Sequence, residues 1–465
     1  MAISTLAASN PNRLARSTRP KQQQQTPKDT FVHPDSTGKI EHLVLQLDSQ
    51  ATPQIRKEVE GAWTKLFKRM DSDVNFTITF ESEKDRQGLR DLLDREQIAN
   101  PERFNLQVVD DLNITMWARD QMVGLGNVGG GNTLLGQTTM RPHGDDEMLP
   151  PIIAASVPGL GFDPDKRLQT DGGDEVSNPK ETFLGYASLH LTARNLYNID
   201  QAEQSKSGIF SPFDKNLRMD YPDAHVNSPD FKFEGNLFKS SPDDKIPQQE
   251  EWLSRAHELF ETKFGHKVTI IGGDDPNTPI VEKPATFHMD MGMTPIDSDK
   301  ILVGDPSIAV AAVNNMTAEE RADHNARINS ALGLPAGNDT LGELVEESTV
   351  NEPHLQHNFD MNAKKVAEGG YMIDRLPYLQ GPPGRSWVTY NNCLMESYTR
   401  DDGSKVRRVF LPTYDLPILD GIAKETYEKQ GFEVIPLNLA ALTSWRGAIR
   451  CISNVLDREV TDAQA

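Results

Sequence analysis

A cysteine near the C-terminal end of the chain stands in a setting that suits nucleophilic chemistry. Cys451 follows the turn residue Gly447 and comes directly before a short apolar run that begins at Ile452. Arg446 and Arg450 lie nearby in sequence, and cations lower the pKa of a thiol and favour the thiolate, which attacks electrophiles. The alternative interpretation is a small core residue at the start of a strand. The rest of the chain must decide, because a nucleophile needs partners.

Two acidic segments could supply such partners. Asp120 ends the segment Trp117-Ala118-Arg119-Asp120, at the close of an apolar stretch, and Asp171 precedes the glycine pair Gly172-Gly173. Both acids also have simpler interpretations. Asp120 could pair with Arg119 or cap a helix, and Asp171 could serve the turn. Neither segment establishes a function by itself.

A third segment combines a histidine with an acid. His288 and Asp290 are two residues apart, so on a strand both side chains point to the same face. Met289, Met291 and Met293 would then be core residues on the opposite face. His288 could equally be a hydrogen-bonded core histidine. As metal ligands, His288 and Asp290 are weak evidence for zinc because no second histidine lies near, and no metal site is predicted.

Together, these residue types match the chemical demands of a guanidinium group. This group is planar, permanently cationic and a poor electrophile, so an enzyme must grip its N–H donors with carboxylates. Hydrolysis also needs a thiolate that attacks the central carbon and a histidine that protonates departing ammonia and later activates water. Cys451, His288 and the three aspartates Asp120, Asp171 and Asp290 could supply these groups.

In their order along the chain, these segments resemble the motifs of the guanidino-group-modifying (pentein) superfamily, which includes arginine and agmatine deiminases, amidinotransferases and protein-arginine deiminases. The likeness is greatest to the catalytic domain of protein-arginine deiminases. Agmatine deiminases are close rivals, because they share the Trp-x-Arg-Asp element and the Gly-x-x-x-Cys ending. The matching segments are Trp117-Ala118-Arg119-Asp120-Gln121-Met122, Gly173-Asp174-Glu175-Val176-Ser177-Asn178-Pro179, His288-Met289-Asp290 and Cys451-Ile452-Ser453-Asn454-Val455.

The resemblance implies an α/β fold in which ββαβ units form a single five-bladed propeller around a central site. It also implies roles for the residues. Cys451 would be the nucleophile and His288 the general acid and base. Asp120 and Asp290 would hold the guanidinium, and Trp117 would pack against its face or its stem.

Three further positions complete the implied site. Asp171 would add a polar contact to the substrate. Arg450 stands where much of the superfamily has histidine, and if it points inward it could take the carboxylate or carbonyl of the substrate. Gln121 stands where animal protein-arginine deiminases have a calcium-binding acid. A neutral amide is a poor substitute for that ligand. The acidic segments Asp145-Asp146-Glu147 and Asp274-Asp275 could still bind a cation, but neither has the twelve-residue EF-hand pattern. We therefore expect activity without calcium or another cofactor.

These features predict a cysteine-dependent deiminase. Its substrate would be the guanidinium of arginine in a peptide or protein, converted through a covalent amidino-thioether to a ureido (citrulline) product and ammonia. The alternatives are an agmatine or free-arginine deiminase and an amidinotransferase, in which an amine replaces water. The alternative from another class is a binding protein that recognises arginine-rich partners without turnover.

The elements that must position these residues alternate between strands and helices. Apolar alternation and β-branched runs predict strands at 40–47, 74–80, 104–109, 268–271 and 432–437. Helical spacing predicts helices that begin at Pro53, near 83, at 251 and near 415, and one near 317–331 with a capping box of Thr317 and Glu320. This alternation indicates an α/β fold.

Irregular composition marks three stretches. Residues 1–37 are rich in Ser, Thr, Gln and Pro and predict a disordered tail, followed by one catalytic domain over 38–460. Residues 200–247 and 333–382 predict insertions without regular structure. Gly124, Gly126 and Gly129 match a dinucleotide-binding pattern, but the following residues predict a strand and a turn rather than the helix that this pattern requires.

Composition narrows the classes of partner. The formal net charge is −21, and no long basic run occurs, which argues against nucleic acid and anionic membranes and is compatible with a cationic guanidino substrate. No apolar stretch is long enough to span a membrane. The two cysteines, Cys393 and Cys451, fit a reducing, cytoplasmic setting. Export through the acid-poor residues 1–37 is the alternative.

Overall fold

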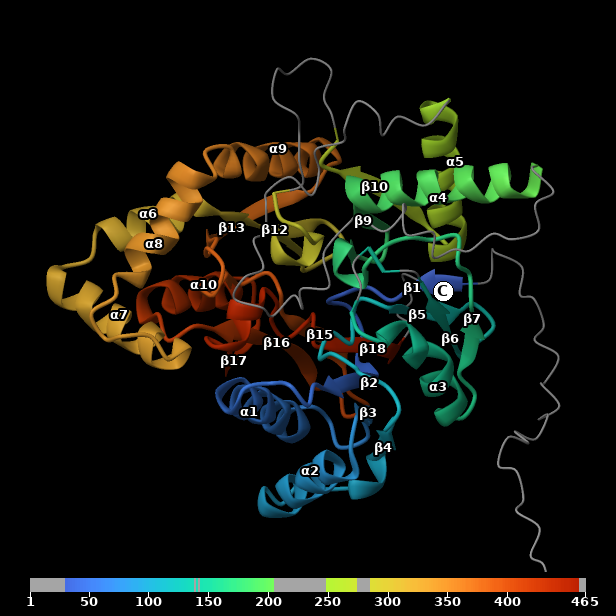
Figure 1. Cartoon of the computed structure of the whole chain (residues 1–465), viewed down its shortest axis with the longest axis horizontal. Helices are drawn as coiled ribbons and strands as arrows, with labels where there is room; N and C mark the ends of the chain where they lie inside the picture. Colours follow the sequence, from blue (N-terminus) through green and yellow to red (C-terminus); the bar gives the residue numbers. More distant parts are fainter. Residues whose placement is uncertain (1–29, 138, 141–142, 205–247, 274–284, 460–465) are drawn as a thin grey trace, which may run out of the picture.

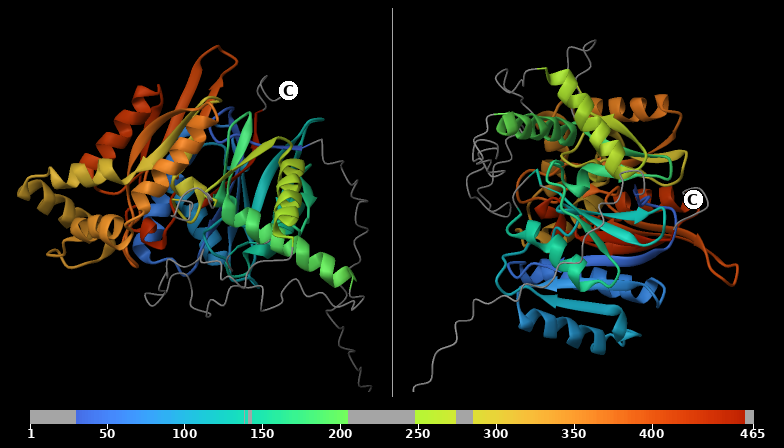
Figure 2. Two further views of the ribbon diagram at one scale, coloured as in Figure 1. Left: turned by 90° about the horizontal axis from the view of Figure 1, so that it is seen from above. Right: turned by 90° about the vertical axis from the view of Figure 1, so that its right-hand side faces the viewer.

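Five separate β-sheets form the blades of an α/β propeller, and helices lie on the outside of the sheets (Figure 1). The computed structural model describes residues 30–137, 139–140, 143–204, 248–273 and 285–459. Figure 2 shows the same arrangement from two further sides, with α2 and α5 at opposite ends of the molecule in its right-hand view. The predicted α/β propeller is confirmed.

The strands of each sheet, in hydrogen-bonded order, are as follows. Blade I contains β18 (Ser453–Arg458), β2 (Ile40–Leu47), β3 (Asn75–Phe80) and β4 (Phe104–Val108). Blade II contains β1 (Thr30–Val32), β5 (Met122–Asn127), β6 (Asn132–Gly136) and β7 (Gly161–Asp163). Blade III contains β10 (Lys267–Ile271), β9 (Glu181–Gly185) and β8 (Glu175–Ser177). Blade IV contains β11 (Met293–Pro295), β12 (Lys300–Asp305), β13 (Met372–Leu379) and β14 (Val388–Thr389). Blade V contains β15 (Leu394–Thr399), β16 (Lys405–Thr413) and β17 (Glu433–Asn438).

One pattern of strand directions recurs in every blade. A leading strand (β18, β5, β8, β11 or β15) pairs antiparallel with a second strand, which pairs parallel with a third. A parallel pair needs a crossover connection, and helices supply it. The helices are α1 (Pro53–Arg69), α2 (Glu83–Arg95), α3 (Leu149–Ser156), α4 (Tyr186–Gln204), α5 (Gln249–Phe264), α6 (Pro306–Asn314), α7 (Ala318–Leu332), α8 (Thr340–Glu346), α9 (Leu355–Glu368) and α10 (Pro417–Lys429).

Helix α1 illustrates why these segments fold as they do. The hydroxyl of Thr52 accepts a hydrogen bond from the backbone N–H of Ile55, and Pro53 occupies the first turn, where its missing N–H costs nothing. The apolar side chains of Val59, Trp63 and neighbouring residues form the buried face and pack into the core of blade I. The helix at 317–331 has the predicted capping box.

The last strand of the described chain pairs with an early one in blade I. The leading strand β18 comes last in the sequence, yet it pairs antiparallel with β2, with Ser453 opposite Leu45 and Asn454 opposite Val44. Both strands are buried over most of their length. This pairing closes the ring of blades and fixes the segment that carries Cys451, two residues before β18.

Two predicted boundaries are wrong. Order begins before residue 38, because Thr30–Val32 form β1 and pair with Leu125–Asn127 of β5. The stretch 333–382 is largely regular and contains α8, α9 and β13. Most of the other predicted insertion, residues 205–247, lies outside the described residues, as do residues 1–29.

Two further sequence expectations can be compared with the described residues. The glycine-rich stretch around Gly124 belongs to the antiparallel hairpin β5–β6, so it lacks the strand–helix geometry of a dinucleotide site. Within the described ranges, none of the helices has the length and apolar character needed to cross a bilayer.

Candidate active site

The segments leading into the five leading strands bring together the residues singled out from the sequence. Asp120 precedes β5 and Asp290 precedes β11. Asp171 precedes β8, and a short 3₁₀ turn lies between them. Cys451 precedes β18, and Asn392 precedes β15 in the same way. In addition, β18 contacts β5 and β8 contacts β11. The recurring blade pattern therefore delivers one polar side chain per blade to a common centre.

The distances define a compact cluster. The reactive atoms of His288, Asp290 and Cys451 lie within 4.8 Å of one another, and those of Asp120, Asp171 and His288 do so as well. The Cys451 Sγ lies 3.8 Å from Asp290 Oδ2. All five side chains are buried. The structure thus brings together every residue to which the sequence assigned acid–base, nucleophilic or carboxylate chemistry.

The thiol is held by Asn392, which sequence reasoning missed. The Asn392 Nδ2 donates to Cys451 Sγ at 3.0 Å. Its Oδ1 accepts from the backbone N–H groups of Ala448, Arg450 and Cys451 at 3.2, 3.0 and 3.2 Å. One amide therefore fixes both the loop and the sulfur. The available signal was positional, because Asn392 precedes an apolar strand just as Asp120 and Cys451 do.

The electrostatic setting of Cys451 differs from the expectation. Burial, followed by the charges of Asp290 and Asp120, raises the thiol pKa well above its ordinary value. The prediction that Arg446 and Arg450 lower this pKa is wrong. Arg450 is neutralised by its own carboxylate partners, and the Arg446 guanidinium lies 5.4 Å from the centre of the Trp387 ring. In this environment the unliganded thiol is protonated.

His288 is oriented by Asp171. The His288 Nε2 lies 3.0 Å from Asp171 Oδ2, and its Nδ1 lies 4.0 Å from Asp120 Oδ1. Asp171 Oδ1 accepts a hydrogen bond from the backbone N–H of Met140 at 2.6 Å, which fixes the carboxylate. Asp171 therefore contacts the histidine and orients its ring. The expected contact of Asp171 with a substrate stays a prediction.

The local structure around His288 was predicted incorrectly. The residue has an extended backbone, but Met289–Met291 form a 3₁₀ turn, and the strand begins only at Met293. The turn still directs His288 and Asp290 into one cluster, while the predicted burial of the three methionines is observed. The close approach also explains Gly173. A side-chain Cβ at this position would lie 2.5 Å from His288 Nδ1.

Asp120 lies between two histidines. Its Oδ2 is 3.3 Å from Nε2 of His143, a buried residue that sequence reasoning missed, and its Oδ1 faces His288. The backbone N–H of Gly173 donates to Oδ1 at 3.4 Å. Burial raises the pKa of Asp120 to about 7, opposed by the charge of His288 and reinforced by that of Asp171. Asp120 therefore titrates near neutrality.

Trp117 flanks the nucleophile loop. The indole is buried, and its six-membered ring packs directly over Gly447, whose ideal Cβ position is also 3.1 Å from Cys451 Cβ. Any larger residue at 447 would collide with the ring. Trp117 thus forms an aromatic wall next to the thiol loop and belongs to the large apolar core that blades I and V share. Its expected packing against the guanidinium stays a prediction.

Arg450 points inward but is committed to protein acceptors. Its Nη1 donates to Asp290 Oδ2 at 2.9 Å, its Nε donates to Asp35 Oδ1 at 3.0 Å, and its Nη2 donates to the carbonyl of Glu175 at 2.8 Å. These bonds favour a positioning role over the expected contact with a substrate carboxylate. Asp290 Oδ1 has no hydrogen-bond partner among the described residues and is buried, so it is available to a ligand.

The residues considered for calcium have other roles. Gln121 is fully buried and donates through Nε2 to Gln46 Oε1. In the acidic segment at 145–147, Asp146 accepts from the backbone and hydroxyl of Thr115, and Glu147 accepts from Thr139. The other acidic segment, Asp274-Asp275, lies outside the described residues.

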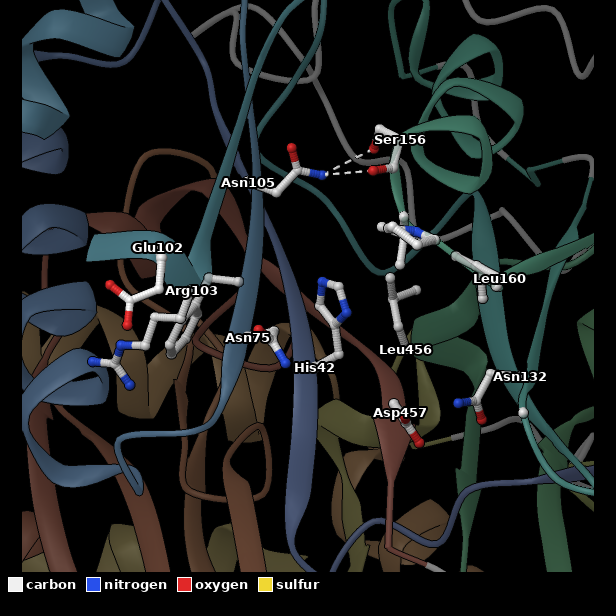
Figure 3. Close-up of a pocket in the computed structure, with 15 residues that line it drawn as sticks. His42, Asn75, Glu102, Arg103, Asn105, Asn132, Ser156, Leu160, Leu456 and Asp457 are labelled. Atoms are coloured by element: carbon white, nitrogen blue, oxygen red, sulfur yellow. Dashed lines mark hydrogen bonds between the residues drawn. The ribbon is translucent and has the colours of Figure 1, made fainter. Parts of the chain in front are cut away.

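A cavity of about 500 Å³ lies elsewhere, between blades I and II. His42, Asn105 and Asp457 are among its lining residues, and Asn105 donates to the carbonyl and hydroxyl of Ser156 across it (Figure 3). Asp457 is four residues along β18 from Ser453, or about 13 Å at the rise of an extended strand. The cavity is therefore separate from the Cys451 cluster.

Comparison with solved structures identifies the architecture. A C. jejuni agmatine deiminase superimposes with a TM-score of 0.50 at 11% identity, covering 91% of this chain and 95% of that chain. An agmatine deiminase of Enterococcus faecalis gives 0.50 at 13% identity, with 94% and 98% covered. A Porphyromonas gingivalis protein provisionally assigned as an arginine deiminase gives 0.52 at 13% identity, with 91% and 97% covered.

No family model matches the chain, and no curated protein matches it in sequence. At identities of 11–13%, the structural likeness establishes the fold, and the chemistry rests on the residues of the site. The match extends over nearly the whole length of each of these structures. This chain has the pentein fold, the α/β propeller of the agmatine deiminases.

Proposed function

We propose that this protein is a cysteine-dependent deiminase that hydrolyses the guanidinium group of its substrate to a ureido group and ammonia. The observation that carries this proposal is the buried cluster of Cys451, His288, Asp120 and Asp290, whose reactive atoms come together from separate blades. A thiol, an imidazole and carboxylates are the groups that a cationic, weakly electrophilic carbon requires.

The carboxylates give the first step. The guanidinium would lie between Asp120 and Asp290 Oδ1, with Trp117 beside it. Its positive charge would offset the carboxylates that raise the pKa of Cys451, so substrate binding itself favours loss of the thiol proton. His288, whose ring lies within 4.8 Å of the thiol, would receive that proton.

The following steps use the same histidine twice. Attack of the thiolate on the central carbon forms a C–S bond, and the tetrahedral adduct breaks one C–N bond as the imidazolium protonates the departing ammonia. The product is an amidino-thioether. His288, neutral again, would take a proton from water, whose oxygen attacks the same carbon. The C–S bond then breaks, the ureido product leaves, and the thiolate takes up a proton to regenerate the thiol. Asp171 would stabilise the imidazolium at each stage.

For the substrate, we favour a small guanidino amine such as agmatine over arginine within a peptide. The supporting observations are the fold shared with agmatine deiminases and the burial of the cluster. Arg450 is already bound to Asp290 and Asp35, so it does not offer a counter-charge for the carboxylate of free arginine. Peptide arginine also lacks a free carboxylate and is the second candidate.

The test compares three substrates. The enzyme should be incubated with agmatine, with free arginine, or with a peptide that contains one arginine and has blocked termini. Ammonia and the ureido product are then assayed. We expect the highest kcat/KM with agmatine, and ammonia release without an added amine acceptor, which an amidinotransferase would require. Preference for the peptide would transfer the assignment to peptide arginine. Binding of all three without ammonia release would refute the deiminase proposal.

A further inference from the structure

Asp35 reaches the site from the N-terminal segment that follows β1. Its backbone N–H donates to the carbonyl of Ser177 at 2.9 Å, and its Oδ2 accepts from the backbone N–H of Ser177 at 2.7 Å. These two bonds tie the segment to β8 of blade III. The other carboxylate oxygen, Oδ1, faces Arg450 and lies 3.0 Å from both Nε and Nη2. Asp35 is therefore aimed at Arg450 by the backbone of the propeller.

Arg450 links Asp35 to Asp290. Its side chain is 4% exposed, and its Nη1 donates to Asp290 Oδ2 at 2.9 Å. Arg450 also donates to the carbonyls of Glu175 and Gly172, at 2.8 and 3.4 Å. The guanidinium is thus fixed in orientation, with one carboxylate on each side. Asp290 Oδ1 is the oxygen left for a ligand.

The net charge of the row Asp35–Arg450–Asp290 decides how well the site can bind a cation. Its two carboxylates and one guanidinium carry a net charge of −1, and the neighbouring Arg119 has its own carboxylate partner, Glu175, at 3.3 Å. A negative charge therefore remains for a bound cation at Asp290. Burial works against the charge of Asp35, but Arg450 and Arg119 hold its pKa below the usual range, so the acid is ionised at neutral pH. Without Asp35, Arg450 alone would neutralise Asp290, and a buried cationic substrate would lose its counter-charge.

We propose that Asp35 is a positioning residue for guanidinium binding, which acts through Arg450 by sharing its charge and so leaving Asp290 free to hold the substrate. The inference rests on the proposed function for its kinetic consequence. Its electrostatic consequence, at the neighbouring thiol, can be measured without any turnover.

The pKa of the Cys451 thiol responds to the charge at Asp290 and Arg450, because these groups lie next to it. Asp290 and Asp120 face Cys451 with negative charge, His288 belongs to the same cluster, and the Arg450 guanidinium is paired with Asp290. Removal of the Asp35 charge leaves Arg450 less compensated. The thiolate then becomes more favourable, and the thiol pKa falls.

The test replaces Asp35 with asparagine, which keeps the size and the acceptor for the Ser177 N–H. We expect Asp35→Asn to raise KM by about tenfold, within the range measured for residues in one ion-pair network, with a smaller change in kcat. The rate of Cys451 alkylation by iodoacetamide is measured against pH on the peptide that contains this residue. Its pH profile should shift to lower pH by roughly half a unit or more. Loosening of the fold would also expose the thiol and lower its pKa. The shift therefore reports the charge when the Tm of Asp35→Asn matches that of the wild type.

Two variants serve as controls. Asp35→Glu retains the charge and should restore most of the substrate affinity and the alkylation profile. Asp85→Asn removes an acid of similar exposure, 12% against 16%, whose partner Arg56 lies on helix α1. It should change neither KM nor the alkylation profile.

Two results would overturn the proposal. One is an Asp35→Asn variant with a wild-type KM and an unshifted alkylation profile. The other is an Asp35→Glu variant that fails to restore either property while its Tm matches that of Asp35→Asn. If the wild-type enzyme turns over no guanidino compound, the proposed function fails. The alkylation profile then still decides whether Asp35 sets the charge at the site.

Discussion

At the scale of single residues, the two cysteines are both buried but have different neighbours. Cys451 lies among carboxylates and the amide of Asn392, whereas Cys393 is buried in the core of blades IV and V and lies 3.3 Å from the hydroxyl of Tyr427. Burial raises the pKa of Cys393 to about 12. Only Cys451 has an acid–base partner within reach, because His288 belongs to its cluster.

The first prediction therefore concerns the nucleophile. Cys451→Ser should reduce turnover to background, because a hydroxyl in this site is a far weaker nucleophile than a thiolate. The substrate should still bind, since both carboxylates remain. Ammonia release and a thermal shift with agmatine measure the two properties. Cys393→Ala is the matched control and should retain kcat. If Cys393→Ala is folded but inactive, Cys451 is not the nucleophile, and Cys393 is.

The second prediction concerns the acids that would hold the guanidinium. We expect Asp120→Asn and Asp290→Asn each to lower kcat/KM. The corresponding loss of transition-state stabilisation is about 2–5 kcal/mol, since each variant removes a charge from a desolvated ionic contact. In the wild type, protonation of Asp120, with its pKa of about 7, should raise KM as the pH falls below 7. Steady-state kinetics between pH 5.5 and 8.5 would show both effects. A near-normal kcat/KM in either variant would make that acid structural.

The third prediction concerns stability at Asp174, a buried acid behind the site. Burial, which outweighs the hydrogen bond from Ser188, raises the pKa of Asp174 to about 7. The folded state therefore binds a proton that the unfolded state has lost, and this contribution to stability, complete below about pH 4, disappears as the pH rises through 7. Asp174→Asn should gain in Tm relative to the wild type between pH 5 and 8.

The comparison needs an acid with the opposite shift. Asp323 is exposed, and its hydrogen bond with Arg327 lowers its pKa, so Asp323→Asn should show no such gain with rising pH. A Tm difference for Asp174→Asn that is flat or decreases over the same range would contradict the assignment of a protonated Asp174.

At the scale of elements, the segments before the leading strands determine the geometry of the site. The sequence identified these segments from their polar residues, but it assigned His288 and Asp290 to a strand. The structure has a 3₁₀ turn at this position, because the apolar methionines pack in the core while the chain turns into β11. The residue types were therefore sufficient to find the site, while the backbone shape depended on tertiary packing.

Asn392 and His143 show what local patterns could not reveal. Asn392 contacts a loop that follows it by more than 50 residues, and His143 meets Asp120 across a long connection. Neither contact leaves a periodic signal in the sequence. Asp35 was missed for a related reason, because it fell within a stretch whose composition predicted disorder. Long-range pairing with β5 overrides that local composition.

The fourth prediction tests the close approach before β8. Gly173→Ala would place a methyl group 2.5 Å from His288 Nδ1 and displace the imidazole from Asp171. We expect kcat to fall by about 100-fold, the lower end of a general acid–base contribution, with a smaller effect on substrate binding. Gly129→Ala, where no atom lies within 4 Å of the new methyl group, is the matched control. Normal kcat in Gly173→Ala would mean that His288 has room to move.

At the scale of the molecule, the α/β propeller was predicted through the resemblance of short motifs rather than through a sequence repeat. The strands at 40–47, 74–80 and 104–109 and the main helices were found from periodicity. The prediction that 333–382 lacks regular structure was wrong, because α8, α9 and β13 form there and Leu341, Leu344, Phe359 and Val366 are buried.

The fifth prediction concerns metal dependence of the whole enzyme. Within the part of the chain that the structure describes, Gln121 has one neutral amide oxygen without a hydrogen-bond partner, and both carboxylate oxygens of Asp146 accept hydrogen bonds from Thr115. These two residues therefore offer calcium a single neutral ligand and no free carboxylate oxygen. We expect treatment with EGTA to leave the rate of ammonia release within about twofold of the untreated enzyme, because calcium needs six to eight oxygen ligands. Loss of activity that added calcium restores would contradict this and strengthen the likeness to animal protein-arginine deiminases.

The pairing of β2 with β18 has a consequence for synthesis of the protein. A ribosome makes β2 early, but its antiparallel partner emerges about 400 residues later, together with Cys451. Until then, β2 has an open hydrogen-bonding edge, which is a site for misassociation. The same order means that Cys451 meets His288 and Asp290 only after nearly the whole chain has been translated. A nascent chain therefore carries the histidine and the acids of the cluster before it carries the sulfur of Cys451.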